Sequence, residues 1–136
     1  MRTMLLPLFS ALMLMLLAPV SAAEPRTHYL LYCSGCHRSD GSSRPPNVPT
    51  LRNELGHLVA VPGGRDYLVR VPGAAQSPLD DGQLAAVMNW VLTEFNAETL
   101  PPQFAPLTVE EVARSRRNIL MDPLKLRAEI YKPYVE

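Results

Sequence analysis

The stretch that decides the interpretation of this chain is Cys33-Ser34-Gly35-Cys36-His37, a C-x-x-C-H sequence. In a helical turn, two thiols three positions apart and an imidazole four positions after the first come round to one face. On that face each thiol can add to one vinyl group of a porphyrin, and the imidazole can reach the metal at its centre. The spacing therefore predicts one covalently bound haem, attached through Cys33 and Cys36 and ligated at its iron by His37.

Three other interpretations of the cysteine pair are open. In an exported protein the pair could be a structural disulfide or a redox-active dithiol. The dithiol needs a helix N-terminus that lowers a thiol pKa, whereas this pair lies at the C-terminal end of a candidate helix, where the helix dipole opposes a thiolate. A zinc site would need four ligands, and outside the C-x-x-C-H sequence only His28 and His57 are of a suitable type. The haem interpretation is favoured over all three.

The segments on either side of the motif differ in composition. A candidate helix runs from Thr27, as its N-cap, to His37, with apolar pairs at helical spacing. Residues 38–49 then switch to Ser, Asp, Gly, Asn and Pro, which is typical of a wrapping loop. Fourteen prolines and seven glycines in the chain argue for few helices and long loops.

Further along, Pro and Gly divide the chain into short pieces. A short helix is expected around residues 52–58, before the break at Pro62-Gly63-Gly64. Another helical turn or two is expected over residues 65–71, and Pro72-Gly73 is expected to break the chain again.

The clearest helix is expected from Asp80 to Phe95. Asp80 is a good N-cap, and Gln83 stands three residues later, as in a capping box. Apolar residues recur along this segment at helical spacing and form one stripe, so the helix should pack against another element: Leu84, Val87, Met88, Val91, Leu92 and Phe95.

The last forty residues continue beyond this helix. Three prolines within residues 96–106 indicate a linker, and Thr108 with Glu111 forms a second capping box for a helix that ends near Asn118. A third short helix is bracketed by Pro123 and Pro133. Basic residues gather near the ends of these helices, where positive charge interacts favourably with the helix dipole. Alternatively, they could form a docking face for an acidic redox partner: Arg114, Arg116, Arg117, Lys125, Arg127 and Lys132.

The first residues have the composition of a signal peptide. Arg2 gives a positive start, residues 5–17 are almost entirely apolar, and Val20-Ser21-Ala22-Ala23 offers small residues for cleavage after Ala22 or Ala23. The apolar run is shorter than the roughly 20 residues that span a bilayer, so we expect no stable membrane span after cleavage. Residues 1–22 therefore predict export to the periplasm.

The charge of the exported part excludes some classes of partner. Cleavage removes Arg2 from the 13 basic residues and none of the 13 acidic ones, leaving a net charge of about −1. A chain with this balance gives no indication of a nucleic-acid partner or of an anionic membrane surface.

Over most of Thr27 to Phe95 the chain resembles the small class I c-type cytochromes. In that family the first helix ends in the C-x-x-C-H sequence, a CHxxDGxG loop follows, and a Pro-x-Leu segment supports the proximal histidine. The matching residues here are Asp40-Gly41, with Ser43 in place of the second glycine, and Pro49-Thr50-Leu51. The resemblance implies that the Pro49 carbonyl accepts the second ring N–H of His37, and that the last helix, with Trp90, crosses the first.

The resemblance also implies a fold and a division of the chain. The fold class is all-α and cytochrome c-like, with few helices wrapped around one covalently bound haem c and long Pro/Gly-rich loops. Residues 1–22 would be the signal peptide and 23–96 the cytochrome c domain. Residues 97–136 would be a Pro-rich linker and a short helical C-terminal extension.

One departure from the family concerns the sixth ligand of the iron. A Met-Pro commonly precedes the last helix in the family, but Val71-Pro72 stands here, and valine cannot ligate iron. After cleavage only two methionines remain, so the sixth position could be filled by His57, Met88, Met121 or water, or by nothing.

Two functions follow from these features. The first is a periplasmic monohaem cytochrome, not an enzyme and without catalytic residues, that carries electrons between a dehydrogenase and a downstream acceptor. Its partners would be redox proteins: a dehydrogenase, an oxidase or another cytochrome. The alternative is a haem-based ligand-binding or sensing domain with an open or unusual sixth iron position.

Overall fold

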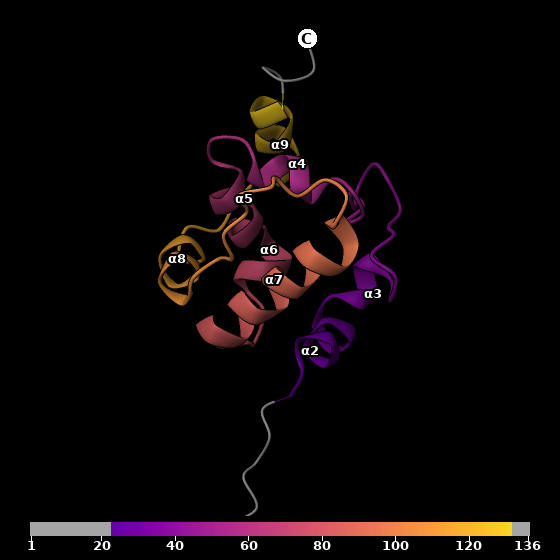
Figure 1. Cartoon of the computed structure of the whole chain (residues 1–136), viewed down its shortest axis with the longest axis vertical. Coiled ribbons are helices and arrows are strands. Elements are labelled where there is room, and N and C mark those ends of the chain that lie inside the picture. Colours follow the sequence, from indigo (N-terminus) through magenta and orange to yellow (C-terminus); the bar gives the residue numbers. More distant parts are fainter. Residues whose placement is uncertain (1–22, 132–136) are drawn as a thin grey trace, which may run out of the picture.

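The computed structural model describes residues 23–131, and within this range the chain forms helices and no strand. Most of the helices are short, and the longest, α7, runs through the middle of the molecule (Figure 1). The helices, in chain order, are α2 (Pro25–Tyr32), α3 (Ser34–His37), α4 (Leu55–Val59), α5 (Gly64–Arg70), α6 (Pro72–Ala75), α7 (Asp81–Asn96), α8 (Val109–Ser115) and α9 (Pro123–Tyr131). The all-α fold class expected from the sequence is confirmed. The predicted signal peptide, residues 1–22, lies outside the described residues.

The first described helix begins earlier than the sequence predicted. Thr27 is not the N-cap, because α2 starts at Pro25 and Glu24 occupies the cap position. Proline suits the first helical position, since its missing N–H has no helical acceptor there and its φ is already helical. The helix ends at Tyr32, and Cys33 separates it from α3.

Pro72 follows the break that the sequence predicted, because the residue before a proline is disfavoured in the helical region, and it also begins a further helix that was not expected. It begins the four-residue helix α6, while the extended residue Val71 (φ −59°, ψ 139°) separates α5 from α6. The physical reason is again the fixed φ of proline, which favours the first turn of a helix as much as it opposes a helix interior.

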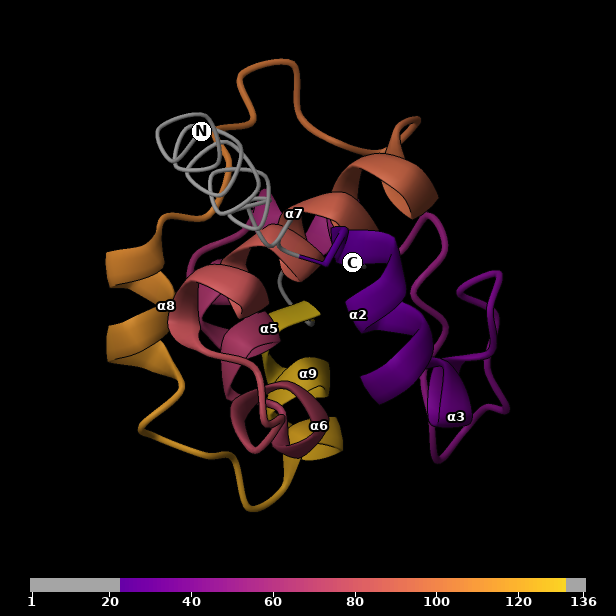
Figure 2. The same cartoon turned by 90° about the horizontal axis from the view of Figure 1, so that it is seen from below.

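Helix α7 organises the core. Its capping box is confirmed, because the Asp80 side chain accepts from the Gln83 N–H and the Gln83 side chain from the Asp80 N–H. Figure 2 shows α7 between α2 on one side and α8 on the other, and both helices pack against it. Its crossing with α2 is made by aromatic rings: Tyr29 lies 5.2 Å from Trp90 and 5.4 Å from Phe95, centroid to centroid. The expected contact between first and last helix of the cytochrome-like part is thus present.

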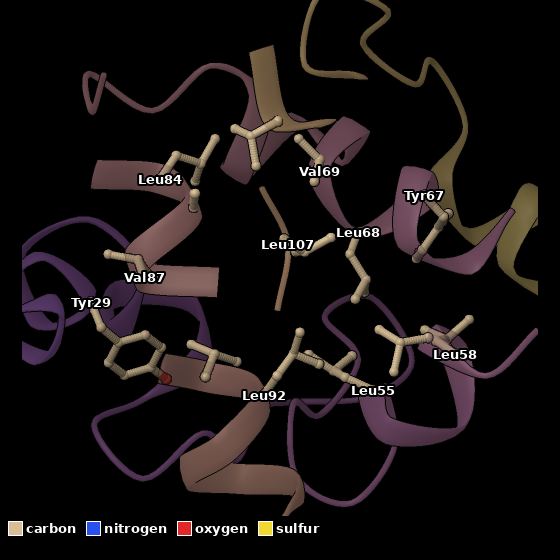
Figure 3. Packing of buried hydrophobic residues seen from close by; sticks show 14 of the residues in the cluster. Tyr29, Leu55, Leu58, Tyr67, Leu68, Val69, Leu84, Val87, Leu92 and Leu107 are labelled. Carbon is tan, nitrogen blue, oxygen red and sulfur yellow. The ribbon is translucent and has the colours of Figure 1, made fainter. Parts of the chain in front are cut away.

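Within the described residues, the buried apolar cluster draws side chains from α2, α4, α5, α7 and α8 and from three connecting segments, those between α6 and α7, between α7 and α8, and between α8 and α9. Figure 3 shows Leu84, Val87 and Leu92 of α7, Leu55 and Leu58 of α4, and residues of α5 and the segment before α8 turned toward a common interior. A polar group also joins two of these helices. The Oδ1 atom of Asn96, which is fully buried, accepts from the N–H groups of Leu55 (2.9 Å) and Gly56 (3.3 Å). Asn96 therefore satisfies the start of α4 from the end of α7.

The segment after α7 packs on the helices that precede it. Asn89 on α7 both donates to the Leu107 carbonyl (3.0 Å) and accepts from the Leu107 N–H (2.8 Å). The capping box of Thr108 and Glu111 is confirmed at α8, and Glu111 also pairs with Arg65 of α5 at 2.9 Å. Helix α9 contacts α5 and lies near α4 at one end of the molecule (Figure 1).

Two of the predicted surface cations, Arg116 and Arg127, are largely buried, each with 15% of its side chain exposed. Arg116 donates to the carbonyl oxygens of Ala75, Ser77 and Leu79 and pairs with Asp81 at 3.0 Å. The segment between α6 and α7 would otherwise present these carbonyls without a donor. Arg116 is therefore committed to structure and cannot belong to an exposed docking face, whereas Arg114 and Arg117 are exposed.

Within the described range, no helix is both long and apolar enough to cross a bilayer.

Candidate functional site

The C-x-x-C-H sequence occupies a tight helical turn after α2. The His37 N–H donates to the Cys33 carbonyl at 3.0 Å, and this bond brings the first and fifth residues of the motif to the same face. The Ser34 hydroxyl donates to the Leu30 carbonyl at 2.7 Å, which ties the turn back to α2. The side chains of Cys33, Cys36 and His37 all reach one cavity.

That cavity, about 320 Å³ in volume, is the natural candidate for a cofactor site. Its walls are mostly aliphatic and come from the whole length of the described chain. The apolar lining residues include Leu51, Leu55, Leu68, Val71, Leu79, Leu84, Val87 and Val91. A large flat apolar group with reactive double bonds and a metal centre fits these walls, because the two thiols and the imidazole stand together on one side.

The ring of His37 is held from behind by Ser43. Its Nδ1 lies 3.0 Å from the Ser43 hydroxyl oxygen, so this hydroxyl, and not the Pro49 carbonyl alone, is the partner of that nitrogen. Burial lowers the pKa of His37, and the Pro49 carbonyl opposes this effect by interacting with the protonated ring. The sequence showed Ser43 only as a departure from a glycine, with no signal that it would face the histidine.

The loop after His37 is anchored by Tyr29 and Gly41. The buried Tyr29 hydroxyl donates to the carbonyls of Arg38 and His37, and burial, together with the nearby Cys33, raises its pKa to about 12. Gly41 has φ +79°, and a Cβ there would lie 2.7 Å from the Phe95 ring. Only glycine combines that conformation with that close approach, which explains the Asp-Gly pair of the loop.

The candidates for a sixth iron ligand are placed far apart. His57 is exposed on α4, Met121 is 96% exposed, and neither lines the cavity. Met88 does line it, as a partly buried member of the α7 stripe. Val71 also lines the cavity, so the residue that replaces the family's methionine faces the interior.

The structure bears on the other interpretations of the cysteines. Both thiols are free, and burial, followed by the proximity of Cys36, raises the pKa of Cys33, which is opposite to what a reactive dithiol needs. Within residues 23–131 no three His, Cys, Asp or Glu side chains gather to hold a metal ion. His28, one of the two further histidines considered as zinc ligands, is buried (8% exposed) beside Tyr32 and does not line the cavity.

Sequence reasoning missed the contribution of the last helix. Pro123, Leu124 and Arg127 of α9 line the same cavity as the C-x-x-C-H sequence. The Arg127 guanidinium donates to Glu54 at 2.9 Å, and the Tyr131 hydroxyl donates to the Glu54 carbonyl at 2.8 Å. These contacts hold α9 against α4, and no local pattern in the sequence indicates them.

Comparisons with known proteins agree with this site. No family model matches the chain. Cytochrome c-552 of Thermus thermophilus is 30% identical over 115 residues, covering 71% of this chain and 87% of that protein. Cytochrome c-552 from a named strain of the same organism is also 30% identical over 115 residues, with 77% of its length covered. The chain therefore belongs to the c-type cytochromes, the electron-transport proteins that carry covalently bound haem c, and its fold is cytochrome c-like.

Proposed function

We propose that this chain is a class I monohaem cytochrome of the bacterial periplasm that transfers electrons between a dehydrogenase and a downstream acceptor. The observation that carries the proposal is the apolar cavity with two thiols and an imidazole on one wall. Cys33 and Cys36 are the attachment residues, and His37 is the iron ligand. The protein acts as a carrier and has no catalytic residues of its own.

Each group of the site has a separate task in this proposal. The haem, when bound, supplies the one-electron change of its iron between the ferrous and ferric states. The thiols of Cys33 and Cys36 would hold the ring through thioether bonds to its two vinyl groups, so that the cofactor would stay in place in both states. Because the Nδ1 atom of His37 faces Ser43, its Nε2 atom is left to bind the metal. The aliphatic walls exclude water and keep reorganisation small.

The division of the chain forms part of the proposal. Residues 1–22 are a signal peptide that directs export, residues 23–96 are the cytochrome c domain, and residues 97–136 are a linker and C-terminal extension. Redox proteins, such as a dehydrogenase, an oxidase or another cytochrome, are the partners.

Mass spectrometry on the protein matured in a host that attaches haem to C-x-x-C-H sequences tests the assignment. We expect a mature chain that begins at residue 23 or 24 and carries one extra haem, located on the peptide with Cys33 and Cys36. A matured chain with both thiols unmodified would overturn the attachment residues.

A second candidate function is a ligand-binding or sensing haem domain. The observation that favours it is that Val71 lines the cavity, while His57 and Met121 do not reach it. Unless Met88 ligates the iron, the sixth position is then open to an exogenous ligand.

The ferrous absorption spectrum with and without carbon monoxide separates the two candidates. Rapid and complete binding of the gas would favour the sensor, and a low-spin spectrum unmoved by the gas would exclude it. Met88→Leu, a volume-conserving change, provides the matched variant. Carbon monoxide binding that occurs only in this variant would identify Met88 as the sixth ligand.

A further inference from the structure

The cavity contains one strongly basic side chain, and in the described part of the chain the rest of its lining is mostly apolar and has no carboxylate. Among its lining residues within the described chain, Arg127 is the only Lys or Arg, and none is Asp or Glu. A haem, however, carries two carboxylates, and a carboxylate that is partly removed from water at the border of an apolar cavity is stabilised by a hydrogen-bonding cation. Arg127 is therefore placed to interact with a carboxylate in the cavity, in addition to its ion pair with Glu54.

The guanidinium of Arg127 has donors to spare. Its Nη2 atom donates to Glu54 at 2.9 Å, and within residues 23–131 no hydrogen bond of its Nε or Nη1 atom to a protein acceptor is present. The side chain is 15% exposed, whereas the Glu54 side chain is 47% exposed, so the pair is placed with the cation inward and the carboxylate outward. An arginine has five N–H donors in a planar fork that matches carboxylates.

A second donor stands beside it. The buried Tyr67 side chain of α5 lines the same cavity, and Arg127 lies close enough to interact with its hydroxyl. Arginine and tyrosine from two different helices thus converge at the junction of α5 and α9.

The position of this pair also suits a haem carboxylate. The carboxylate-bearing edge of a haem lies opposite the edge with the vinyl groups, which the thiols of Cys33 and Cys36 would hold. Figure 1 shows α9 beside α4 at one end of the molecule and α2, which leads into the cysteines, at the other. The carboxylate edge would therefore point toward the α4, α5 and α9 end.

We propose that Arg127, assisted by Tyr67, binds a propionate carboxylate of the haem, so that the C-terminal extension completes the cofactor site. This rests on the proposed function, because it takes haem attachment at Cys33 and Cys36 as given. Arg127 is a binding residue for the cofactor's carboxylate and not a ligand of the iron.

The test compares Arg127→Gln with Lys125→Gln in the full-length matured protein. Lys125 lies on the same helix and is exposed, and its loss changes the charge equally without touching the cavity. Haem attachment is first verified by mass, so that failure of the proposed function is seen separately. We expect Arg127→Gln to shift the propionate bending band in the resonance Raman spectrum and to lower the reduction potential, because a cation near the iron is lost. Lys125→Gln should leave the band unchanged and move the potential less.

Arg127→Lys keeps the positive charge, and it replaces Arg127→Gln in the test if too little of that variant acquires haem. It should shift the propionate band, because the planar fork is lost, while the potential stays closer to that of the wild type. A propionate band identical in wild type and in the Arg127 variants that carry haem would overturn the proposal, as would a crystal structure of the matured protein with both propionates distant from Arg127.

Discussion

Residues 23–96 and residues 97–131 contribute to the same cavity in different ways. The first stretch supplies the thiols, the imidazole and most aliphatic walls, all within or next to recognisable local patterns. The second supplies a proline, a leucine and the single arginine of the lining, from a helix with no recognisable motif. The comparison teaches that a five-residue pattern can bring two thiols and an imidazole to one wall of the cavity. The opposite part of the lining, and the positive charge in it, depend on how a distant helix packs.

The largest effect should come from the cysteines of the first stretch. Cys33→Ala combined with Cys36→Ala should abolish covalently retained haem, because no other thiol lies in residues 23–136. Haem staining after denaturing electrophoresis measures this. The control is Ser34→Ala, which removes only the hydrogen bond to Leu30 and should keep full staining. Haem retained by the double variant would show that attachment does not use this pair.

Substitution of Asn96 measures how much the hydrogen bonds between α7 and α4 contribute to the stability of the first stretch. Asn96→Ala should lower the free energy of unfolding by about 3 kcal/mol, since it leaves the N–H groups of Leu55 and Gly56 buried without an acceptor. Chemical denaturation measures this. Asn118→Ala, at an exposed site in the second stretch, should change stability by less than about 0.5 kcal/mol. Equal effects of the two variants would contradict the role of Asn96.

Glu111 tests the docking of the second stretch. The Arg65 guanidinium, which donates to both carboxylate oxygens, lowers the pKa of Glu111. A carboxyl group with a depressed folded pKa stabilises the fold above its unfolded pKa, and this contribution is lost as the pH falls through the folded pKa. Glu111→Gln should therefore cost about 1 kcal/mol near neutral pH, after allowance for partial exposure, and progressively less in acid.

Denaturation at several pH values measures the Glu111 effect, with Glu110→Gln as the neighbouring control that lacks a bond to Arg65. If the difference between wild type and Glu111→Gln does not shrink toward low pH, the ion pair does not hold the extension.

The smallest effect is expected at Ser43, which lies behind His37, the proposed iron ligand. Ser43→Ala removes the hydroxyl next to His37 Nδ1, and the Pro49 carbonyl remains as a partial substitute. We expect a loss of roughly 0.5 kcal/mol in stability and a slightly higher reduction potential, because the imidazole donates less charge to the metal. Voltammetry measures the potential. Ser42→Ala, whose hydroxyl instead donates to Asp40, should leave it unchanged.

Local patterns predicted much of the fold correctly. The capping boxes at Asp80 and Thr108 are present because both of their hydrogen bonds join residues three apart, so sequence spacing alone determines them. The error at Thr27 was also local, because Pro25 begins a helix that the sequence analysis had started later. At Pro72 the predicted break is present, and the sequence analysis missed only the short helix that begins there.

The sequence by itself determined that the thiols and imidazole of residues 33–37 share one helical turn, whatever surrounds them. Only the tertiary structure decided which distant side chains meet that turn. It placed Ser43 behind the imidazole, turned Arg116 inward and left His57 outside the cavity. It also brought Arg127 to the cavity. No helical period relates the positions of these residues along the chain. The contacts therefore form only when the helices pack together.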